Sequence, residues 1–260
     1  MEKLDIINPF NALVYHKEIV SSTMDVSYDL ASAGEKHGTV IAADFQETGR
    51  GRIKDRVWEM EREINLPFTI LLKYSKIESI PPALTLRAGL ALTFAIEDFL
   101  PELQGKVFVK WPNDIMIGGK KTAGILCEAA GGNVHLGIGI NVAQKEFPPH
   151  LKRKATSIAL EIESGLDPSQ RFCLLKKILT RLFDELETRA GENWKKRLEE
   201  RLYKKGELVI FIEGSADSGR EIRGCITGIG DNGELLILPE GDNILQAFIT
   251  GELKFPISLC

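Results

Sequence analysis

The chain has 260 residues, which is enough for one large domain or for a catalytic domain with a small appendage. Hydrophobic residues make up 43% of the chain and charged residues 27%, a composition that is ordinary for a folded globular protein and excludes intrinsic disorder. The chain carries 33 Lys and Arg against 37 Asp and Glu, and a net charge of −4 argues against a general nucleic-acid coat.

The N-terminus and the cysteines bear on the compartment. Residues 1–5 are charged and contain no apolar signal core, and we expect no stretch with the ~18 apolar residues of a membrane span. The four cysteines lie far apart without a CxxC pair, which favours free thiols over a disulfide framework. They are Cys127, Cys173, Cys225 and Cys260. We therefore expect a cytoplasmic protein that does not contact a membrane.

Familiar catalytic motifs are missing from the sequence. The four histidines show neither metal-ligand spacing nor an HExxH motif, so no metal site on the protein is predicted. The segment 118–122 lacks the upstream glycine of a phosphate-binding loop, and there is no GxSxG nucleophile motif. Phosphate chemistry, if present, must use another arrangement.

The predicted elements of the first part of the chain are strands around one helix. Apolar residues at helical spacing predict a buried helix over 81–100, which Pro101 terminates. Glycine pairs at 118–119 and 131–132 mark two hairpins. Strands are predicted at 38–45, 68–74, 106–111, 115–117, 122–129 and 134–142. Successive hairpins indicate a mixed or antiparallel sheet rather than a βαβ array.

The second part of the chain changes from helix to short strands. Asp167 and Pro168 are typical of a helix start, and Gly191 is expected to interrupt the helix before the periodicity resumes at Trp194. Short strands separated by Gly, Asp and Asn turns follow Gly206 and predict a small barrel. They are expected at 207–213, 220–230, 234–238 and 243–253. The predicted fold class is therefore α+β, with a mixed β-sheet domain flanked by helices and a small C-terminal β-barrel.

Four segments carry candidate chemistry, and the first is a basic loop at 46–58. Its Gly-Arg-Gly-Arg run, residues 49–52, lets backbone N–H groups approach a ligand and offers guanidinium groups to carboxylate or phosphate oxygens. A solvated basic loop is the alternative interpretation. RNA binding is a further alternative, for which a single Gly-Arg segment is weak evidence.

The other three segments lie on or beside predicted strands. Lys-Trp-Pro-Asn-Asp at 110–114 closes a strand, and strand ends are common places for ligand contacts. Lysines precede Gly124 in the segment 120–128, and the segment 137–142 contains two glycines. Glycine within a strand indicates close approach of a ligand or of another backbone. A simple turn, a hairpin with surface lysines and a β-bulge are the respective alternatives.

Together, and in this order, the four segments resemble the biotin protein ligase family over about residues 14–253. The motifs are GRGR, KWPND, KxAGILxE and GIGINV. The resemblance implies a catalytic domain on a mixed sheet, shared with lipoate ligases, over residues 1–205. It also implies an SH3-like barrel over residues 206–260.

The resemblance implies an ATP-dependent ligase. Such an enzyme activates biotin as biotinyl-5′-AMP with release of pyrophosphate and transfers biotin to a lysine of a biotin carboxyl carrier protein domain. ATP and Mg²⁺ on its phosphates are implied, and a homodimer is left open. Residues 1–13 are too few for a winged helix–turn–helix, so DNA binding is not expected. A lipoate or octanoate ligase and a non-catalytic binding module remain as alternatives.

Individual residues take roles by the same resemblance. Biotin binding is implied for Ser22, Thr23, Met24, Gln46, Arg50, Gly51, Arg52, Lys121, Gly124 and Gly139. ATP binding is implied for Arg50, Arg52, Trp58, Lys110, Asn113, Lys121 and Asn141, with Trp58 stacked near adenine. The catalytic residues would be Arg52, Lys121 and Asp114. The two cations would offset the anionic charge of the reactants, and Asp114 would orient or deprotonate the acceptor lysine.

Two departures from the family pattern bear on the site. Met24 stands where the family usually has Asn, which should weaken a polar contact to the ligand ring. The stretch 53–57 replaces a usual Gly-Arg pair, is one residue longer and contains Asp55, which should alter retention of the adenylate. The charge argument as a whole requires Arg50, Arg52 and Lys121 to converge on one cavity.

Overall fold

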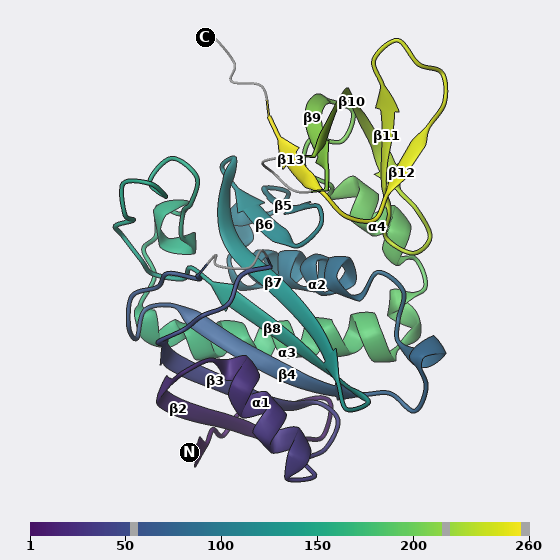
Figure 1. Ribbon diagram of the computed structural model, residues 1–260. Coiled ribbons are helices and arrows are strands. Elements are labelled where there is room, and N and C mark those ends of the chain that lie inside the picture. The colour runs from purple at the N-terminus through teal and green to yellow at the C-terminus, as the bar shows by residue number, and fades with distance from the viewer. Residues whose placement is uncertain (53–56, 215–218, 256–260) are drawn as a thin grey trace.

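An eight-stranded mixed sheet is the larger part of the computed structural model, which describes residues 1–52, 57–214 and 219–255 (Figure 1). The strands run in the order β1-β2-β3-β4-β8-β7-β6-β5. They are β1 Glu2–Lys3, β2 Val14–Val20, β3 Thr39–Gln46, β4 Leu66–Lys73, β5 Val107–Lys110, β6 Asp114–Ile117, β7 Lys120–Ala130 and β8 Asn133–Ile140. β2 and β3 are parallel, joined through α1 (Thr23–Ser32), while the other neighbouring pairs are antiparallel.

Helices cover both faces of this sheet. α1 packs on one face, against β3, β4 and β8, while α2 (Leu84–Phe99) and α3 (Arg171–Glu187) lie on the other (Figure 1). The alternation of side chains along β3 serves both layers: Val40 belongs to the main core, whereas Ile41 packs with Tyr15 on the α1 side. Short 3₁₀ turns occupy Ile77–Ser79, Pro101–Leu103, Ile158–Leu160, Pro168–Gln170 and Arg189–Gly191.

α2 is a core helix that is apolar on most of its faces. The window Ile77–Phe99 is long and apolar enough, by composition alone, to cross a membrane, and the sequence prediction overlooked it. Most of this window is buried, because α2 packs against β5, β6 and β7 and against α3. Its buried Arg87 donates from Nε to Glu185 Oε1 on α3 at 2.9 Å, so the two helices are also joined by a charged pair. Packing in the core therefore accounts for the composition.

A separate five-stranded antiparallel sheet follows α4 (Trp194–Glu200) in the order β12-β11-β10-β9-β13. Its strands are β9 Leu208–Glu213, β10 Arg220–Ile229, β11 Leu235–Pro239, β12 Gln246–Phe248 and β13 Glu252–Lys254. The continuous strand predicted over 243–253 is wrong, since the chain leaves one edge of the sheet after β12 and joins the opposite edge as β13. Gly251 makes this crossing with φ +154°, a conformation that residues with side chains rarely adopt.

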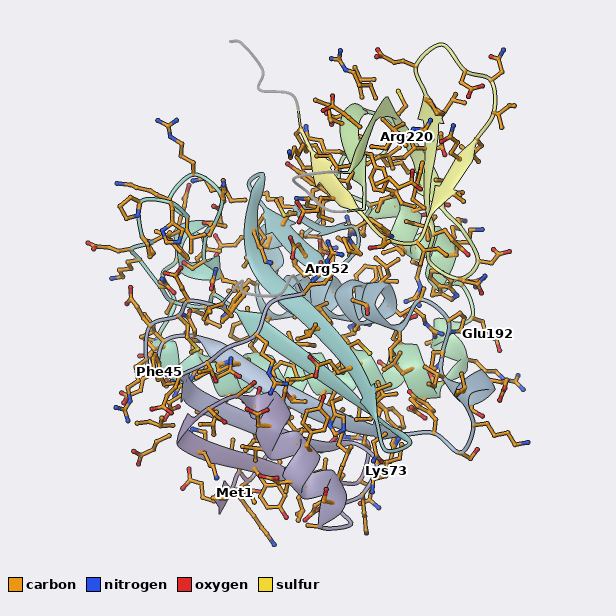
Figure 2. All side chains as sticks on the ribbon, viewed as in Figure 1. Met1, Phe45, Arg52, Lys73, Glu192 and Arg220 are labelled. Atoms are coloured by element: carbon orange, nitrogen blue, oxygen red, sulfur yellow. The ribbon has the colours of Figure 1, made fainter. Side chains whose placement is uncertain are left out.

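The C-terminal sheet contacts the larger part of the chain at Trp111, which follows β5, and at Arg52. The indole Nε1 of Trp111, which precedes Pro112 through a cis peptide bond, donates to the Gly233 carbonyl at 2.9 Å. Arg52 donates from Nη2 to the Gly251 carbonyl at 3.0 Å, and Figure 2 shows Arg52 at this junction. Two of the motif segments thus reach the second sheet.

The predicted fold class is confirmed: a mixed sheet with flanking helices and a small C-terminal β unit. Asp167 is a helix cap as predicted, although its capping box closes a 3₁₀ turn and α3 begins at Arg171. The predictions for Cys260 and for most of the 53–57 stretch lie outside the described residues. The division of the chain into domains at 205/206 stays a prediction.

Candidate functional site

A cavity lies between α1, the segment after β3, and strands β7 and β8. It is lined by Ser22, Thr23, Met24, Gln46, Arg50, Gly51, Arg52, Trp58, Asn113, Lys121, Gly124, Ile125, Leu126, Gly137, Ile138 and Gly139. Every residue predicted for the site is in this wall except Lys110, Asp114 and Asn141. Arg50, Arg52 and Lys121 share the cavity, as the charge argument requires.

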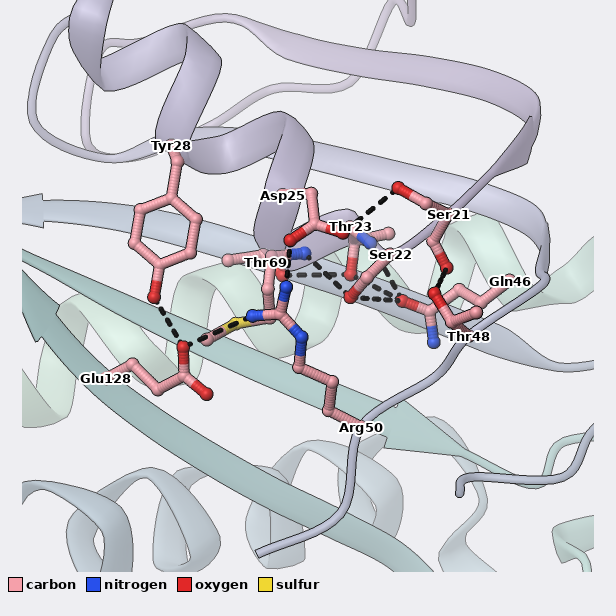
Figure 3. Close-up of polar contacts among 11 residues, drawn as sticks. Ser21, Ser22, Thr23, Asp25, Tyr28, Gln46, Thr48, Arg50, Thr69 and Glu128 are labelled. Carbon is pink, nitrogen blue, oxygen red and sulfur yellow. Dashed lines mark hydrogen bonds and ion pairs between the residues drawn. The ribbon is translucent and has the colours of Figure 1, made fainter. Parts of the chain in front are cut away.

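One end of the cavity is built from uncharged hydroxyl and amide groups. Ser22 caps α1 and accepts a hydrogen bond from the Met24 amide at 3.2 Å, which satisfies one of the free donors of the first helical turn. Gln46 ends β3 and accepts at Oε1 from the Thr23 amide at 2.8 Å and from Thr23 Oγ1 at 3.0 Å (Figure 3). This leaves the two Nε2 donors of Gln46 unpaired among the described residues and available to a polar ligand.

Met24 forms an apolar patch beside these polar groups. Its side chain is buried, and its sulfur lies close to Gly137. A Cβ added to Gly137 would lie 2.7 Å from that sulfur. Gly137 therefore accommodates Met24 rather than a ligand. The predicted loss of a polar contact at position 24 is consistent with this packing, since a thioether is at best a weak acceptor.

Trp58 lies against a pair of glycines at the other end. Gly124 on β7 and Gly139 on β8 are direct cross-strand partners, and a Cβ on Gly139 would lie 2.8 Å from the indole Cε2. The β7–β8 register is continuous through both glycines, so the β-bulge alternative for the segment 137–142 is wrong. The missing side chains make a flat bed that the indole occupies in this structure.

A β-bulge does occur one strand away, and it aims Lys121. The β6–β7 register shifts between Ile115, which pairs with Ala123, and Met116, which pairs with Lys121. The extra residue brings Lys121 to the same face as Gly124, although three positions separate them in the chain. Lys121 Nζ then lies 2.6 Å from Asp114 Oδ1 and 5.4 Å from the centre of the Trp58 ring.

The two arginines of the wall have partners of different kinds. Arg50 lies between the carboxylates of Asp25 on α1 and Glu128 on β7, with 3.4 Å to Glu128 Oε2. Arg52, by contrast, donates to the carbonyl of Gly251 in the C-terminal sheet. Arg50 therefore joins walls of the cavity, whereas Arg52 joins the cavity to the second sheet.

Three predicted residues lie outside the wall. Asp114 contacts it through Lys121. Lys110 points toward the C-terminal segment, with Nζ 5.1 Å from the centre of the Phe255 ring. Asn141 is buried behind the wall, where it donates to the Thr156 carbonyl at 3.0 Å and its Oδ1 has no hydrogen-bond partner among the described residues. The catalytic role of Asp114 and the nucleotide-binding roles of Lys110 and Asn141 stay predictions.

The motif search missed some residues of the site. Thr69 donates to Thr23 Oγ1 at 2.9 Å, and the signal for it was a single polar side chain in an apolar strand. Asp25 stands three residues after the cap Ser22, a spacing that marks helix starts. Glu128 closes the KxAGILxE motif but was given no role there.

Burial shifts two titratable groups behind α1. It raises the pKa of Tyr28 to about 12, and the hydrogen bond that Tyr28 donates to Glu128 adds to this shift. It also lowers the pKa of His135, whose Nδ1 lies 2.8 Å from Ser27 Oγ. Both groups are therefore neutral at pH 7. Among the described residues there is no group of three or more His, Cys, Asp or Glu side chains that could hold a metal ion.

The arrangement of the mixed sheet, α1 and the cavity is that of a known protein family. Residues 17–144 match the family model described as the Biotin/lipoate A/B protein ligase family. The biotin--[acetyl-CoA-carboxylase] ligase of Paracoccus denitrificans is 30% identical over 216 residues, which cover 80% of this chain and 87% of that protein. The chain therefore belongs to the biotin/lipoate A/B protein ligase family.

Further similarities are to biotin protein ligases in particular. The bifunctional ligase/repressor BirA of Bacillus subtilis is 39% identical over 163 residues, or 60% of this chain. That match spans 48% of the relative, about half of its length. The solved structure of the biotin protein ligase from Aquifex aeolicus in complex with biotin and ATP has a TM-score of 0.74 and 28% identity. The matched region covers 93% of this chain and 97% of the Aquifex chain.

Proposed function

We propose that this protein is an ATP-dependent biotin protein ligase. The observation that carries the proposal is a single cavity with an uncharged hydrogen-bonding end at Ser22, Thr23 and Gln46 and with the cations Arg52 and Lys121 elsewhere in the same wall. A neutral polar ring at one end of a ligand and an anionic group at the other fit this arrangement. Biotin has a ureido ring and a carboxylate, and the Aquifex relative is described with biotin and ATP.

The first step joins the acid to the nucleotide. A carboxylate oxygen of biotin bonds to the α-phosphorus of ATP, the bond from that phosphorus to the bridging oxygen breaks, and pyrophosphate leaves. Two anions must approach each other, so fixed positive charge lowers the barrier. Lys121 and Arg52 supply that charge, and the Gln46 Nε2 donors and the hydroxyl groups hold the ring.

Mg²⁺ would enter on the phosphates of ATP. The wall of the cavity offers amide and hydroxyl oxygens, with no carboxylate among its described residues. This donor set fits a metal held chiefly by the nucleotide. When bound, the ion would offset phosphate charge.

The second step transfers the acyl group. A lysine of the carrier domain attacks the acyl carbon, a C–N bond forms, the bond from that carbon to the phosphate oxygen breaks, and AMP leaves. The amine must lose a proton, and Asp114 is the group we assign to orient it or accept that proton. Asp114 is paired with Lys121 at 2.6 Å here, so contact of Lys121 with phosphate would release this carboxylate.

ATP–pyrophosphate exchange with biotin, lipoate and octanoate supplied separately tests the proposal. We expect exchange with biotin, followed by a mass gain of one biotinyl group on a biotin carboxyl carrier domain. Exchange with lipoate or octanoate instead would assign the chain to the other branch of the family. Tight binding of an acid without exchange would favour a non-catalytic module.

A further inference from the structure

Arg50 links three segments that border the cavity. It stands on the segment that follows β3, and its guanidinium reaches Asp25 in the first turn of α1 and Glu128 on β7 (Figure 3). Glu128 is itself held, because Tyr28 from α1 donates a hydrogen bond to the same Oε2. The ion pairs thus connect segments that lie 25 and 78 residues from Arg50 in the chain.

The charges of this cluster show what Arg50 can do. One guanidinium faces two carboxylates, so the group carries a net negative charge. The donors of Arg50 are directed at two carboxylates, in contrast to Arg52, which donates to one neutral backbone carbonyl. An anionic ligand that recruited Arg50 would leave Asp25 and Glu128 without their cation.

We propose that Arg50 is a positioning residue: it fastens the segment 46–52 to α1 and β7 across the cavity and so retains the bound acid and its adenylate. The proposal rests on the proposed function for the identity of that ligand. Its physical basis is that a mixed anhydride must be kept from water and from escape between the two steps. A contact that bridges α1, β7 and the loop slows exit without touching the reacting atoms.

Substitution of the acidic partners distinguishes this role from direct ligand binding. We expect Arg50→Gln, Asp25→Asn and Glu128→Gln each to speed release of biotinyl-5′-AMP, formed with labelled biotin and chased, by about fivefold, the effect of a partly exposed charge pair. If Arg50 bound the ligand itself, the two acid-to-amide variants would free its guanidinium and slow release. Slower or unchanged release in both would overturn the proposal.

Three further variants sharpen the comparison. Arg50→Lys should retain the adenylate better than Arg50→Gln, because it keeps the positive charge. The double variant Arg50→Gln/Asp25→Asn should release the adenylate no faster than the stronger single variant, because Arg50→Gln already removes the contact with Asp25. Arg62 is the matched control, since it also lies between two carboxylates, Glu18 at 3.6 Å and Glu63 at 3.5 Å, but does not line the cavity. Arg62→Gln should leave release unchanged.

Hydrogen exchange of the ligand-free protein gives a readout that does not depend on biotin. We expect the backbone amides of 46–52 to exchange faster in Arg50→Gln and Asp25→Asn than in the unmodified chain and in Arg62→Gln, with unchanged thermal unfolding. Unchanged exchange would overturn the proposal. Faster exchange in a chain that shows no biotin-dependent pyrophosphate exchange would mean that the proposed function has failed while the role of Arg50 stands.

Discussion

The two ends of the cavity are built in opposite ways. At the polar end, Ser22 and Thr23 are adjacent in the chain, and the cap of α1 places both hydroxyl groups beside Gln46. At the cationic end, Lys121 is aimed by a bulge and paired with Asp114, while Trp58 comes from a distant loop. Local helix capping builds the first end, and packing of distant segments builds the second.

This difference predicts how each end responds to change. The groups of the polar end are buried and bonded to one another, so loss of one leaves others unsatisfied and affects folding as well as binding. Lys121 at the other end is partly exposed and contributes little to stability, so its loss should act on the reaction. Five measurements test this contrast, from the largest expected effect to the smallest.

Lys121→Ala should have the largest effect, on the reaction and not on the fold. Loss of one charge-stabilising donor costs about 10²–10³ in rate, so biotin-dependent pyrophosphate exchange should nearly disappear. Lys120→Ala, which changes the neighbouring lysine, is the control and should exchange normally. Normal exchange in the Lys121 variant would remove Lys121 from the mechanism.

Thr23→Val tests the polar end. It leaves the buried Thr69 hydroxyl without its acceptor and removes one of the donors to Gln46, so we expect the free energy of unfolding to fall by about 1–3 kcal/mol and the KM for biotin to rise. Thr93→Val is the matched control, because its buried hydroxyl bonds within α2, away from the cavity. A stable Thr23 variant with reduced kcat alone would contradict the contrast.

Gly139→Ala tests the glycine bed. The added methyl group would meet the Trp58 ring, and overpacking of this kind costs about 1–3 kcal/mol, measured by urea unfolding. The double variant Gly139→Ala/Trp58→Ala should recover most of that loss, since the indole has gone. No recovery would show that the glycine serves another contact.

Arg52→Ala tests whether the contact between the cavity and the C-terminal sheet helps to retain the adenylate. The side chain bonds to the Gly251 carbonyl, and loss of a charged hydrogen bond of about 1.5 kcal/mol should speed adenylate release about tenfold, seen as free biotinyl-5′-AMP. Arg223→Ala, on an exposed position of β10, is the control. Equal release from both variants would argue that the junction has no part in retention.

His135 should give the smallest effect, through pH. Burial lowers the pKa of His135 below its ordinary value of 6.5, so below that pH the unfolded chain binds more protons than the folded one. The free energy of unfolding should therefore fall as the pH drops from 7 toward 5. In His135→Gln, urea unfolding at pH 7 and pH 5.5 should show a smaller fall.

Much of the fold could be predicted from local patterns. The strands around the two glycine hairpins, the buried helix α2 and the cap at Asp167 follow from periodicity and turn chemistry, which neighbouring residues determine. β2 and α1 were missed, and for α1 the reason is physical. The buried face of α1 contains Thr23 and Ser27, because it packs beside the polar end, so it lacks the apolar stripe that predicts a helix.

The sequence by itself determined which residue types form the site, since the motif segments supply nearly all of the cavity wall. Tertiary structure alone decided what each one contacts. The bulge that turns Lys121 toward Gly124 depends on the pairing of β6 with β7, and the contacts of Trp58 with Gly139 and of Arg50 with Glu128 join residues distant in the chain. Such contacts depend on strand register and packing, which no local pattern of residues encodes.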